Sequence, residues 1–95
     1  MHTFIQQSTL HISGSVTVHT LNADVCRQFA QQCTQPEIHY LDGSHIEKAD
    51  SAALSLILIA QRARQGSLKP LILQNWPKAA EDLAQLYDIQ EWINT

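Results

Sequence analysis

The sequence predicts an α/β domain with a mixed, mostly parallel sheet of four to five strands and about three helices. Some stretches alternate apolar and polar residues, as strands do. They are separated by stretches whose apolar residues recur at helical spacing. Pro36 and Gly66, which interrupt regular structure, stand between such stretches. Because strands that alternate with helices pair mainly in parallel through right-handed crossovers, we expect the order strand, strand, helix, strand, helix, strand, helix.

The N-terminal third of the chain supplies the first two strands and the first helix. We expect strands at Phe4–Gln7 and Thr9–Ser13, the second of which alternates apolar and polar side chains. Thr20 is the expected N-cap of a helix that ends near Cys33, since Thr is a favoured capping residue. The apolar residues of this helix recur at every fourth position and are Leu21, Val25, Phe29 and Cys33.

The segment 38–66 is the unit around which the chain is organised. It predicts a short strand that ends before Gly43, a tight loop, and a very apolar helix whose first turn is Asp50–Ala53. A carboxylate and a hydroxyl at the helix start match its unpaired backbone N–H groups, and two arginines suit the negative end of its dipole. Gly66 is expected to take the left-handed conformation that commonly follows a helix.

The last third of the chain is expected to add one strand and one helix. The strand spans Leu68–Gln74, with Pro70 near its start or at a sheet edge. Asn75 is the expected cap of the final helix and Pro77 one of its first residues. The residues expected to face inward from this helix, or to cover the end of the core beyond it, are Ala79, Ala80, Leu83, Leu86, Tyr87, Ile89, Trp92 and Ile93.

Length, charge and hydropathy bound the class of protein. The 95 residues, 44% of them hydrophobic, predict one globular domain, 1–95. A net charge of −3 gives no reason to expect nucleic acid or an anionic membrane surface as a partner. The longest apolar run, Ala52–Ala60, is interrupted by Ser55 and falls short of the roughly 18 residues of a membrane span. Because Met1–Phe4 lacks a basic segment before an apolar core, we expect a cytoplasmic protein.

Neither the cysteines nor the histidines predict a metal or a cofactor. Cys26 and Cys33 fall on one predicted helix, about 10 Å apart along its axis, so reduced thiols are expected. The five histidines, His2, His11, His19, His39 and His45, include no His-Glu-x-x-His motif, and no Cys-x-x-Cys occurs. His11 and His39 are polar alternates on strands, and solvated positions explain them.

Ser51 lies in the first turn of the helix predicted within the segment 38–66, which we call the central helix, and it is a poor candidate for a nucleophile. Ser51 lies in no Gly-x-Ser-x-Gly elbow, and the Asp50 carboxylate beside it is the wrong base to take its proton at neutral pH. The three glycines are isolated, so no phosphate-binding loop is expected. We therefore expect no enzymatic activity.

The distribution of apolar and polar residues around the central helix indicates which of its sides contacts the sheet and which is exposed. At 100° per residue, the side that must face the sheet carries Ala53, Leu56, Ile57, Ala60 and Ala63. The opposite side carries Ser51, Ser55, Leu58 and Arg62, with Leu54 on its flank. Two leucines inside a polar rim have the composition of a partner interface, and packing under the final helix is the alternative explanation.

Ser51 has a structural and a functional interpretation. In the first, its hydroxyl caps the helix and contributes about 1 kcal/mol. In the second, the hydroxyl is a switch that accepts a phosphate and with it about −1.5 to −2 charges. The positive end of a helix tolerates that charge, whereas an acidic or apolar partner surface would not.

The residues around this helix start resemble the signature of STAS domains, the family of anti-sigma-factor antagonists and sulfate-transporter tails. That signature is an apolar strand ending in Asp-Leu-Ser, an apolar position, and Asp-Ser/Thr-small-Gly-Leu opening a helix. Here it corresponds to Leu41-Asp42-Gly43-Ser44, then Ile46, then Asp50-Ser51-Ala52-Ala53-Leu54. Gly43 departs from the usual apolar residue, and Ala53 from the usual glycine, which makes the helix start stiffer and bulkier.

The resemblance covers nearly the whole chain and implies a STAS fold. Leu10–Gly14 is similar to the second strand of the family and Leu83–Ile89 to its last helix. That ending is most similar to small cytoplasmic STAS subunits of phospholipid ABC transporters in Gram-negative bacteria. The resemblance implies a non-catalytic regulatory subunit that binds the transporter ATPase, peripheral to the inner membrane, and helps to maintain the lipid asymmetry of the outer membrane without inserting into a membrane or binding lipid.

The site residues that the resemblance carries over are Asp50 and Ser51, with the adjoining helix face of Leu54, Ser55, Leu58 and Arg62 as the partner surface. The alternative within the family is an anti-sigma-factor antagonist of a partner-switching pathway, with Ser51 as its phosphorylation site. A STAS module that binds a nucleotide or another small molecule is a third possibility.

Overall fold

The computed structural model describes residues 1–66, 69–78, 80 and 82, which hold four strands and two helices. The elements in chain order are β1 (His2–Gln6), β2 (Thr9–Val16), α1 (Ala23–Cys33), β3 (Tyr40–Ala49), α2 (Ala52–Ala63) and β4 (Ile72–Gln74). The predicted order of the first six elements is confirmed. The predicted final helix and the closing C-terminal residues lie almost entirely outside the described residues.

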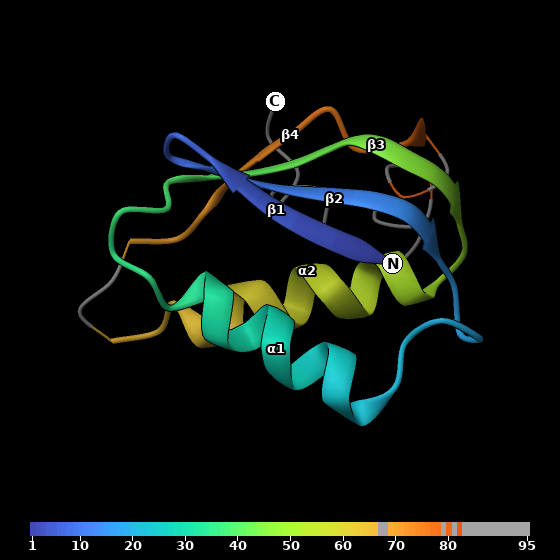
Figure 1. Ribbon diagram of the computed structural model, residues 1–95, viewed down its shortest axis with the longest axis horizontal. Helices are drawn as coiled ribbons and strands as arrows, with labels where there is room; N and C mark the ends of the chain where they lie inside the picture. Colours follow the sequence, from blue (N-terminus) through green and yellow to red (C-terminus); the bar gives the residue numbers. More distant parts are fainter. Residues whose placement is uncertain (67–68, 79, 81, 83–95) are drawn as a thin grey trace.

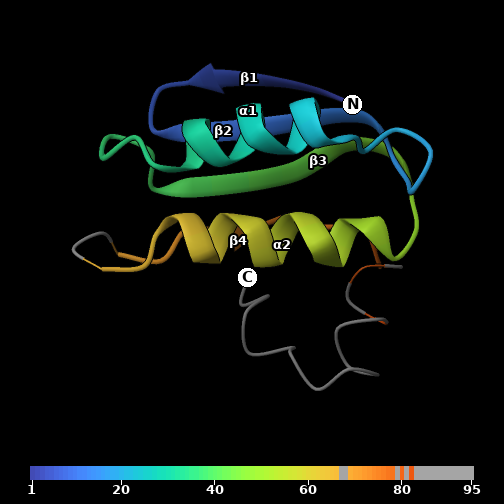
Figure 2. The ribbon, with the colours of Figure 1, turned by 90° about the horizontal axis from the view of Figure 1, so that it is seen from below.

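The four strands form one mixed sheet in the order β1-β2-β3-β4. β1 pairs with β2 antiparallel, whereas β2 with β3 and β3 with β4 are parallel pairs, so the α/β class with a mostly parallel sheet is confirmed. Both helices cover the same face of the sheet (Figure 1). Seen from that side, α1 lies in front of β2 and α2 lies on the side of β4 (Figure 2). The other face carries His11, Asp42 and His45, which we call the histidine cluster.

The core lies between the sheet and the two helices. The predicted alternation over Thr9–Ser13 is correct, because Leu10 and Ile12 have no exposed surface. The strand runs three residues further than predicted, to Val16, which is also fully buried. Of the five residues predicted to face the sheet from α2, Ala63 is half-buried, and the fully buried ones are Ala53, Leu56, Ile57 and Ala60. Each buried leucine or isoleucine stabilises the fold by roughly 1.5–3 kcal/mol relative to an exposed one. The apolar side of α2 therefore fixes its orientation on the sheet.

β3 is longer than predicted, and no tight loop separates residue 43 from α2. Its ten residues pair in parallel with the eight residues of β2. Two register shifts, one between His11 and Ser13 and one between Gly14 and Ser15, accommodate the two additional residues. The sequence predicts a loop here because glycine commonly interrupts a strand, whereas the strand continues past Gly43 through both register shifts.

Gly43 lies in the first of these irregular stretches. A Cβ atom at this position would lie 3.2 Å from the Cα of Trp76 and 3.3 Å from the side chain of Ile46. Trp76 is itself buried, and its Nε1 donates a hydrogen bond of 3.3 Å to the carbonyl of Leu41. A side chain at position 43 would therefore require Trp76 or Ile46 to shift, and glycine fits this close approach.

The predicted N-cap of α1 is wrong by two residues. Asn22 is the cap, because its Oδ1 accepts a hydrogen bond of 2.9 Å from the N–H of Val25. The Thr20 hydroxyl is already used in the preceding turn, where it donates to the carbonyl of Ser15 and accepts from the N–H of Thr17. At the other end of the chain, β4 is shorter than the predicted Leu68–Gln74 strand.

Arg64, just beyond the end of α2, is a buried cation that joins three segments, with only 3% of its surface exposed. Its Nε donates to the carbonyl of Lys69 at 2.7 Å, and its Nη1 donates to the carbonyls of Cys33 at 3.1 Å and Gln35 at 3.0 Å. Because the last turn of α1 has no basic residue, Arg64 supplies the positive charge that the negative end of its dipole favours. The predicted left-handed Gly66 follows, with φ of +95°.

Replacing Arg64 by Met should lower the free energy of unfolding by about 2–4 kcal/mol, because three carbonyls lose their donor in a partly or fully buried setting. Urea denaturation monitored by circular dichroism measures the change. Arg62→Met, at an exposed position two residues earlier, is the matched control and should stay within about 0.5 kcal/mol of the wild type. Equal losses in the two variants would contradict the role given to Arg64.

The two cysteines are free thiols, as predicted, but they differ in burial, since Cys26 is half-buried and Cys33 has no exposed surface. Burial raises the pKa of the Cys33 thiol to about 12, although the Arg64 charge opposes the shift. We expect a thiol reagent at pH 8 to label one cysteine in the folded protein and the second only after unfolding, because the thiolate is the reactive species. Cys26→Ser should abolish the labelling of the folded protein, and persistent rapid labelling of that variant would contradict this assignment.

Candidate functional site

The exposed side of α2 carries four of the six residues that the sequence predicts for the partner site. Ser51, at the N-cap position, and Ser55, Leu58 and Arg62 along the helix are all exposed, and their spacing of four, three and four places them on one strip. Leu58 in the middle of the strip has 40% of its surface exposed. We call these four residues the α2 strip.

Leu54 does not belong to the α2 strip, and its predicted place on the partner surface is wrong. Only 7% of its surface is exposed, and it belongs to the core cluster that includes Trp76 and Ala80. Leu54 lies on the flank of α2 that also carries Gln61, whose Nε2 donates to the carbonyl of Leu71. Packing within the domain, the alternative weighed from the sequence, therefore explains Leu54.

Asp50 caps α2, whereas the sequence also offered the hydroxyl of Ser51 for that purpose. Asp50 Oδ1 accepts a hydrogen bond of 2.8 Å from the N–H of Ala52, and Oδ2 accepts one of 3.2 Å from the N–H of Val18. These hydrogen bonds, together with the nearby His19, hold the pKa of Asp50 below its ordinary value. One carboxylate thus stabilises the helix start and ties it to the segment that follows β2.

The Ser51 hydroxyl takes no part in that cap. Ser51 has helical backbone angles, φ −59° and ψ −16°, and its side chain makes no capping hydrogen bond. An exposed hydroxyl at the positive end of a helix can bind a partner or accept a phosphate without breaking an internal contact. The structural interpretation of Ser51 as the cap is therefore wrong.

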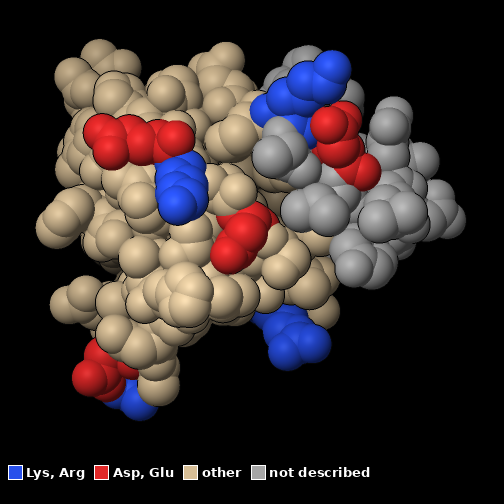
Figure 3. Space-filling model, turned by 90° about the vertical axis from the view of Figure 1, so that its right-hand side faces the viewer, with Lys and Arg blue, Asp and Glu red and all other residues tan. Residues whose placement is uncertain are grey.

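The surface around the start of α2 carries both signs of charge. Figure 3 shows the end of the molecule at which β3 ends and α2 begins, and there acidic and basic side chains are scattered among uncharged ones. Within the described part of this face, the basic side chains form no continuous patch of the kind that binds nucleic acid. Arg62, in the last turn of α2, is the cation of the α2 strip.

In the described ranges, no helix is long and apolar enough to cross a bilayer.

A groove of about 510 Å³ lies elsewhere, between the start of β1 and the exposed side of α1. Glutamine side chains, among them Gln28, Gln31 and Gln32, make up much of its lining. None of the residues predicted for the partner site borders this groove.

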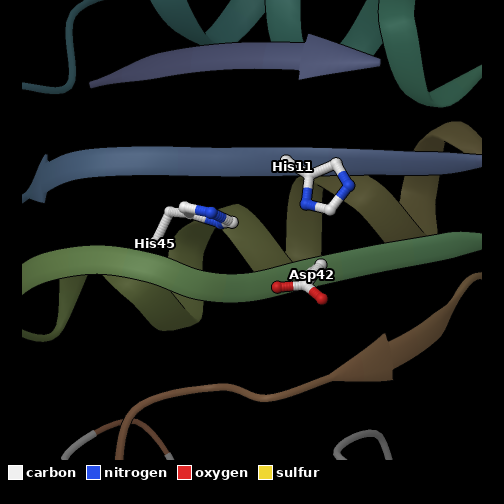
Figure 4. A group of neighbouring side chains, drawn as sticks. All are labelled: His11, Asp42 and His45. Carbon is white, nitrogen blue, oxygen red and sulfur yellow. The ribbon is translucent and has the colours of Figure 1, made fainter. Parts of the chain in front are cut away.

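The structure brings together three side chains that the sequence analysis left apart. His11 and Asp42 are register partners on β2 and β3, and His45 is the partner of Ser13. In a regular strand, residues three apart point to opposite faces, but the register shift between His11 and Ser13 places Asp42 and His45 on the same face. Figure 4 shows the three side chains on the side of the sheet away from α2.

His11 is not the solvated residue that the sequence predicted. It is half-buried, and its ring stacks on Phe4 with the centroids 4.6 Å apart and the planes 8° from parallel. His39 is exposed, as predicted. Sequence spacing gives no signal for the cluster, because its members come from two strands and depend on a shift in their pairing.

Comparison with models of known protein families finds no match to this sequence, and comparison with curated proteins finds none either.

Asp50→Ala should lower the midpoint of thermal unfolding by several degrees, because the N–H groups of Ala52 and Val18 lose their acceptor. Ser51→Ala, the matched control, should change the free energy of unfolding by less than about 0.5 kcal/mol. Differential scanning calorimetry of the two variants measures both effects. A larger loss in Ser51→Ala than in Asp50→Ala would contradict the assignment of the cap.

The Asp50 cap also predicts a pH dependence. The folded-state pKa of Asp50 lies below its unfolded value, so its contribution to stability is present above about pH 4 and is lost as the pH falls through the folded pKa. We expect the stability difference between the wild type and Asp50→Ala to shrink in acid. Urea denaturation at a series of pH values measures it, and a difference that stays constant down to pH 2 would contradict the prediction.

Proposed function

We propose that this protein is a non-catalytic regulatory subunit of the STAS type that binds the ATPase of a phospholipid ABC transporter through the α2 strip. Within that class the chain is most like MlaB, the small cytoplasmic subunit of the Mla transporter. In this role it is peripheral to the inner membrane, supports the assembly and activity of the ATPase, and contributes to the lipid asymmetry of the outer membrane. It hydrolyses nothing and needs no cofactor.

The observation that carries the proposal is the exposure of the α2 strip directly beside the capped start of the helix. Ser51, Ser55 and Leu58 present two hydroxyls and an aliphatic side chain on a rigid helix, with Arg62 at the end of the strip. A partly exposed leucine within a polar rim has the composition of the centre of a protein interface. The resemblance of residues 41–54 and 83–89 to the family supplies the kind of partner.

The burial of the remaining apolar face of α2 supports the same site. Because Ala53, Leu56, Ile57 and Ala60 are fully buried and Leu54 nearly so, the fold itself uses those residues. Leu58 is the large apolar residue of α2 that the fold leaves more than a third exposed. A partner that binds this side of α2 therefore contacts one apolar residue, Leu58, surrounded by groups that supply hydrogen bonds and one positive charge.

Leu58→Asp should abolish co-purification with the ATPase, because a carboxylate buried at the centre of an interface costs several kcal/mol. The matched control is Ile5→Asp, which changes a residue of nearly equal exposure, 42%, on the edge strand β1. We expect both variants to fold, as judged by circular dichroism, and only Leu58→Asp to lose the ATPase. Retained binding in Leu58→Asp would exclude the α2 strip as the docking surface.

The second candidate is an anti-sigma-factor antagonist that a kinase switches by phosphorylating Ser51. It is favoured by one observation, the exposed Ser51 hydroxyl that takes no part in the helix cap. Intact mass measured on protein isolated from its native cells distinguishes the two functions. A population heavier by one phosphate that disappears in Ser51→Ala would favour the antagonist, whereas a single unmodified mass with the ATPase bound would favour the transporter subunit.

A further inference from the structure

The cluster of His11, Asp42 and His45 has the composition of a metal site. Each residue offers one ligand atom, two imidazole nitrogens and one carboxylate oxygen, and these atoms lie within 4.8 Å of one another. Two histidines and one carboxylate are the protein ligands of many zinc enzymes and of other first-row transition-metal sites that keep a position open. The three side chains come from the adjacent strands β2 and β3 (Figure 4).

The second observation that points to a bound ligand is a ring nitrogen of His11 that lacks a hydrogen-bond partner. Its Nδ1 atom is buried and has no hydrogen-bond partner among the described residues. A buried ring nitrogen without a partner is uncommon, because folding removes its hydrogen bond to water and no hydrogen bond within the protein replaces it. The stack on Phe4 and the edge contact with His45, with centroids 5.6 Å apart, hold the His11 ring in this place.

Asp42 and His45 are already oriented by other groups, as ligands in metal sites usually are. Asp42 is 7% exposed, and its Oδ1 accepts the N–H of Ser44 at 2.6 Å while its Oδ2 accepts from Asn75 Nδ2 at 3.1 Å. Burial tends to raise the pKa of Asp42, but these hydrogen bonds and the nearby His11 outweigh it, so the pKa is lowered and the carboxylate is charged at neutral pH. The Nδ1 of His45 lies 3.2 Å from the Ser44 hydroxyl, which leaves Nε2 for a ligand.

We propose that His11, Asp42 and His45 form a binding site for a divalent transition-metal ion, with Zn²⁺ as the best match. Two imidazoles and a carboxylate suit Zn²⁺, whereas Mg²⁺ and Ca²⁺ take oxygen ligands. Ligands of a tetrahedral Zn²⁺ lie about 3.4 Å apart, given bond lengths near 2.1 Å. The separations between the three donors, at most 4.8 Å, must therefore shorten by no more than about 1.4 Å, which side-chain rotation can supply. The fourth position is filled by water or by a donor from a partner.

This site is independent of the proposed docking surface. The cluster lies on the face of the sheet opposite α2, and no residue of the α2 strip belongs to it. Loss of ATPase binding in Leu58→Asp therefore leaves metal binding unchanged, and the failure of one proposal does not imply the failure of the other.

The test is isothermal titration of Zn²⁺ into the protein, purified without a polyhistidine tag and freed of metal by a chelator. We expect one Zn²⁺ per chain and a higher midpoint of thermal unfolding with Zn²⁺ present, since the ion binds the folded state. His11→Phe, which keeps a ring against Phe4, and His45→Ala, at an exposed position, should each weaken binding by more than about tenfold. Asn75→Ala, which removes a hydrogen bond that orients Asp42, should weaken it by about 10–100-fold.

His39→Ala is the matched control, because this exposed histidine lies just before β3 and outside the cluster. It should bind Zn²⁺ as the wild type does, and Mg²⁺ in place of Zn²⁺ should show no saturable heat. Co²⁺ should give the visible absorption of a four-coordinate ion in the wild type and not in His45→Ala. The proposal is overturned if the wild type shows no saturable Zn²⁺ binding, if folded His11→Phe and His45→Ala bind as tightly as the wild type, or if His39→Ala loses as much affinity as they do.

Discussion

The parallel pairing of β2 with β3 is the constraint on which the rest of the structure depends. Ten residues run beside eight, and the excess is taken up in two places rather than in a loop. The first shift turns Asp42 and His45 to one face and places Gly43 against Trp76. The second lets β3 continue to Ala49, so that Asp50 arrives beside Val18 and caps α2. The histidine cluster and the position of the α2 start both follow from this one pairing.

The two faces of the sheet therefore serve different purposes. On one face, the helices bury the aliphatic residues of β2 and of α2, and the side of α2 turned away from the sheet carries the exposed α2 strip. The opposite face carries aromatic and titratable side chains, with Phe4 laid across His11 and beside His45. The buried half of α2 and the Asp50 cap together hold this helix in place on the sheet.

Local patterns in the sequence were sufficient for the elements and for much of the core. Period-two alternation predicted the burial of Leu10 and Ile12, and helical periodicity predicted both the buried side of α2 and the exposure of Leu58. The left-handed conformation of Gly66 could be predicted because glycine is the residue most often found in that conformation just after a helix. The inward position of Leu54 could not be predicted from periodicity, because it depends on packing in the core beside Trp76 and Ala80. The sequence offered both the Asp50 carboxylate and the Ser51 hydroxyl for the helix start, and only the structure shows that Asp50 Oδ1 accepts the hydrogen bond of Ala52. The histidine cluster needed the register of two strands, which no spacing within one strand reveals.

The buried guanidinium of Arg64 has a consequence for motion within the domain. One side chain holds the end of α1, the end of α2 and the approach to β4 through three carbonyls. Fraying of either helix at that end must break hydrogen bonds shared with the other, so the two ends open as one cooperative unit rather than separately. Amides in the last turns of α1 and α2 should then exchange their hydrogens with similar free energies of opening. The N-terminal turns are capped by separate residues, Asn22 and Asp50.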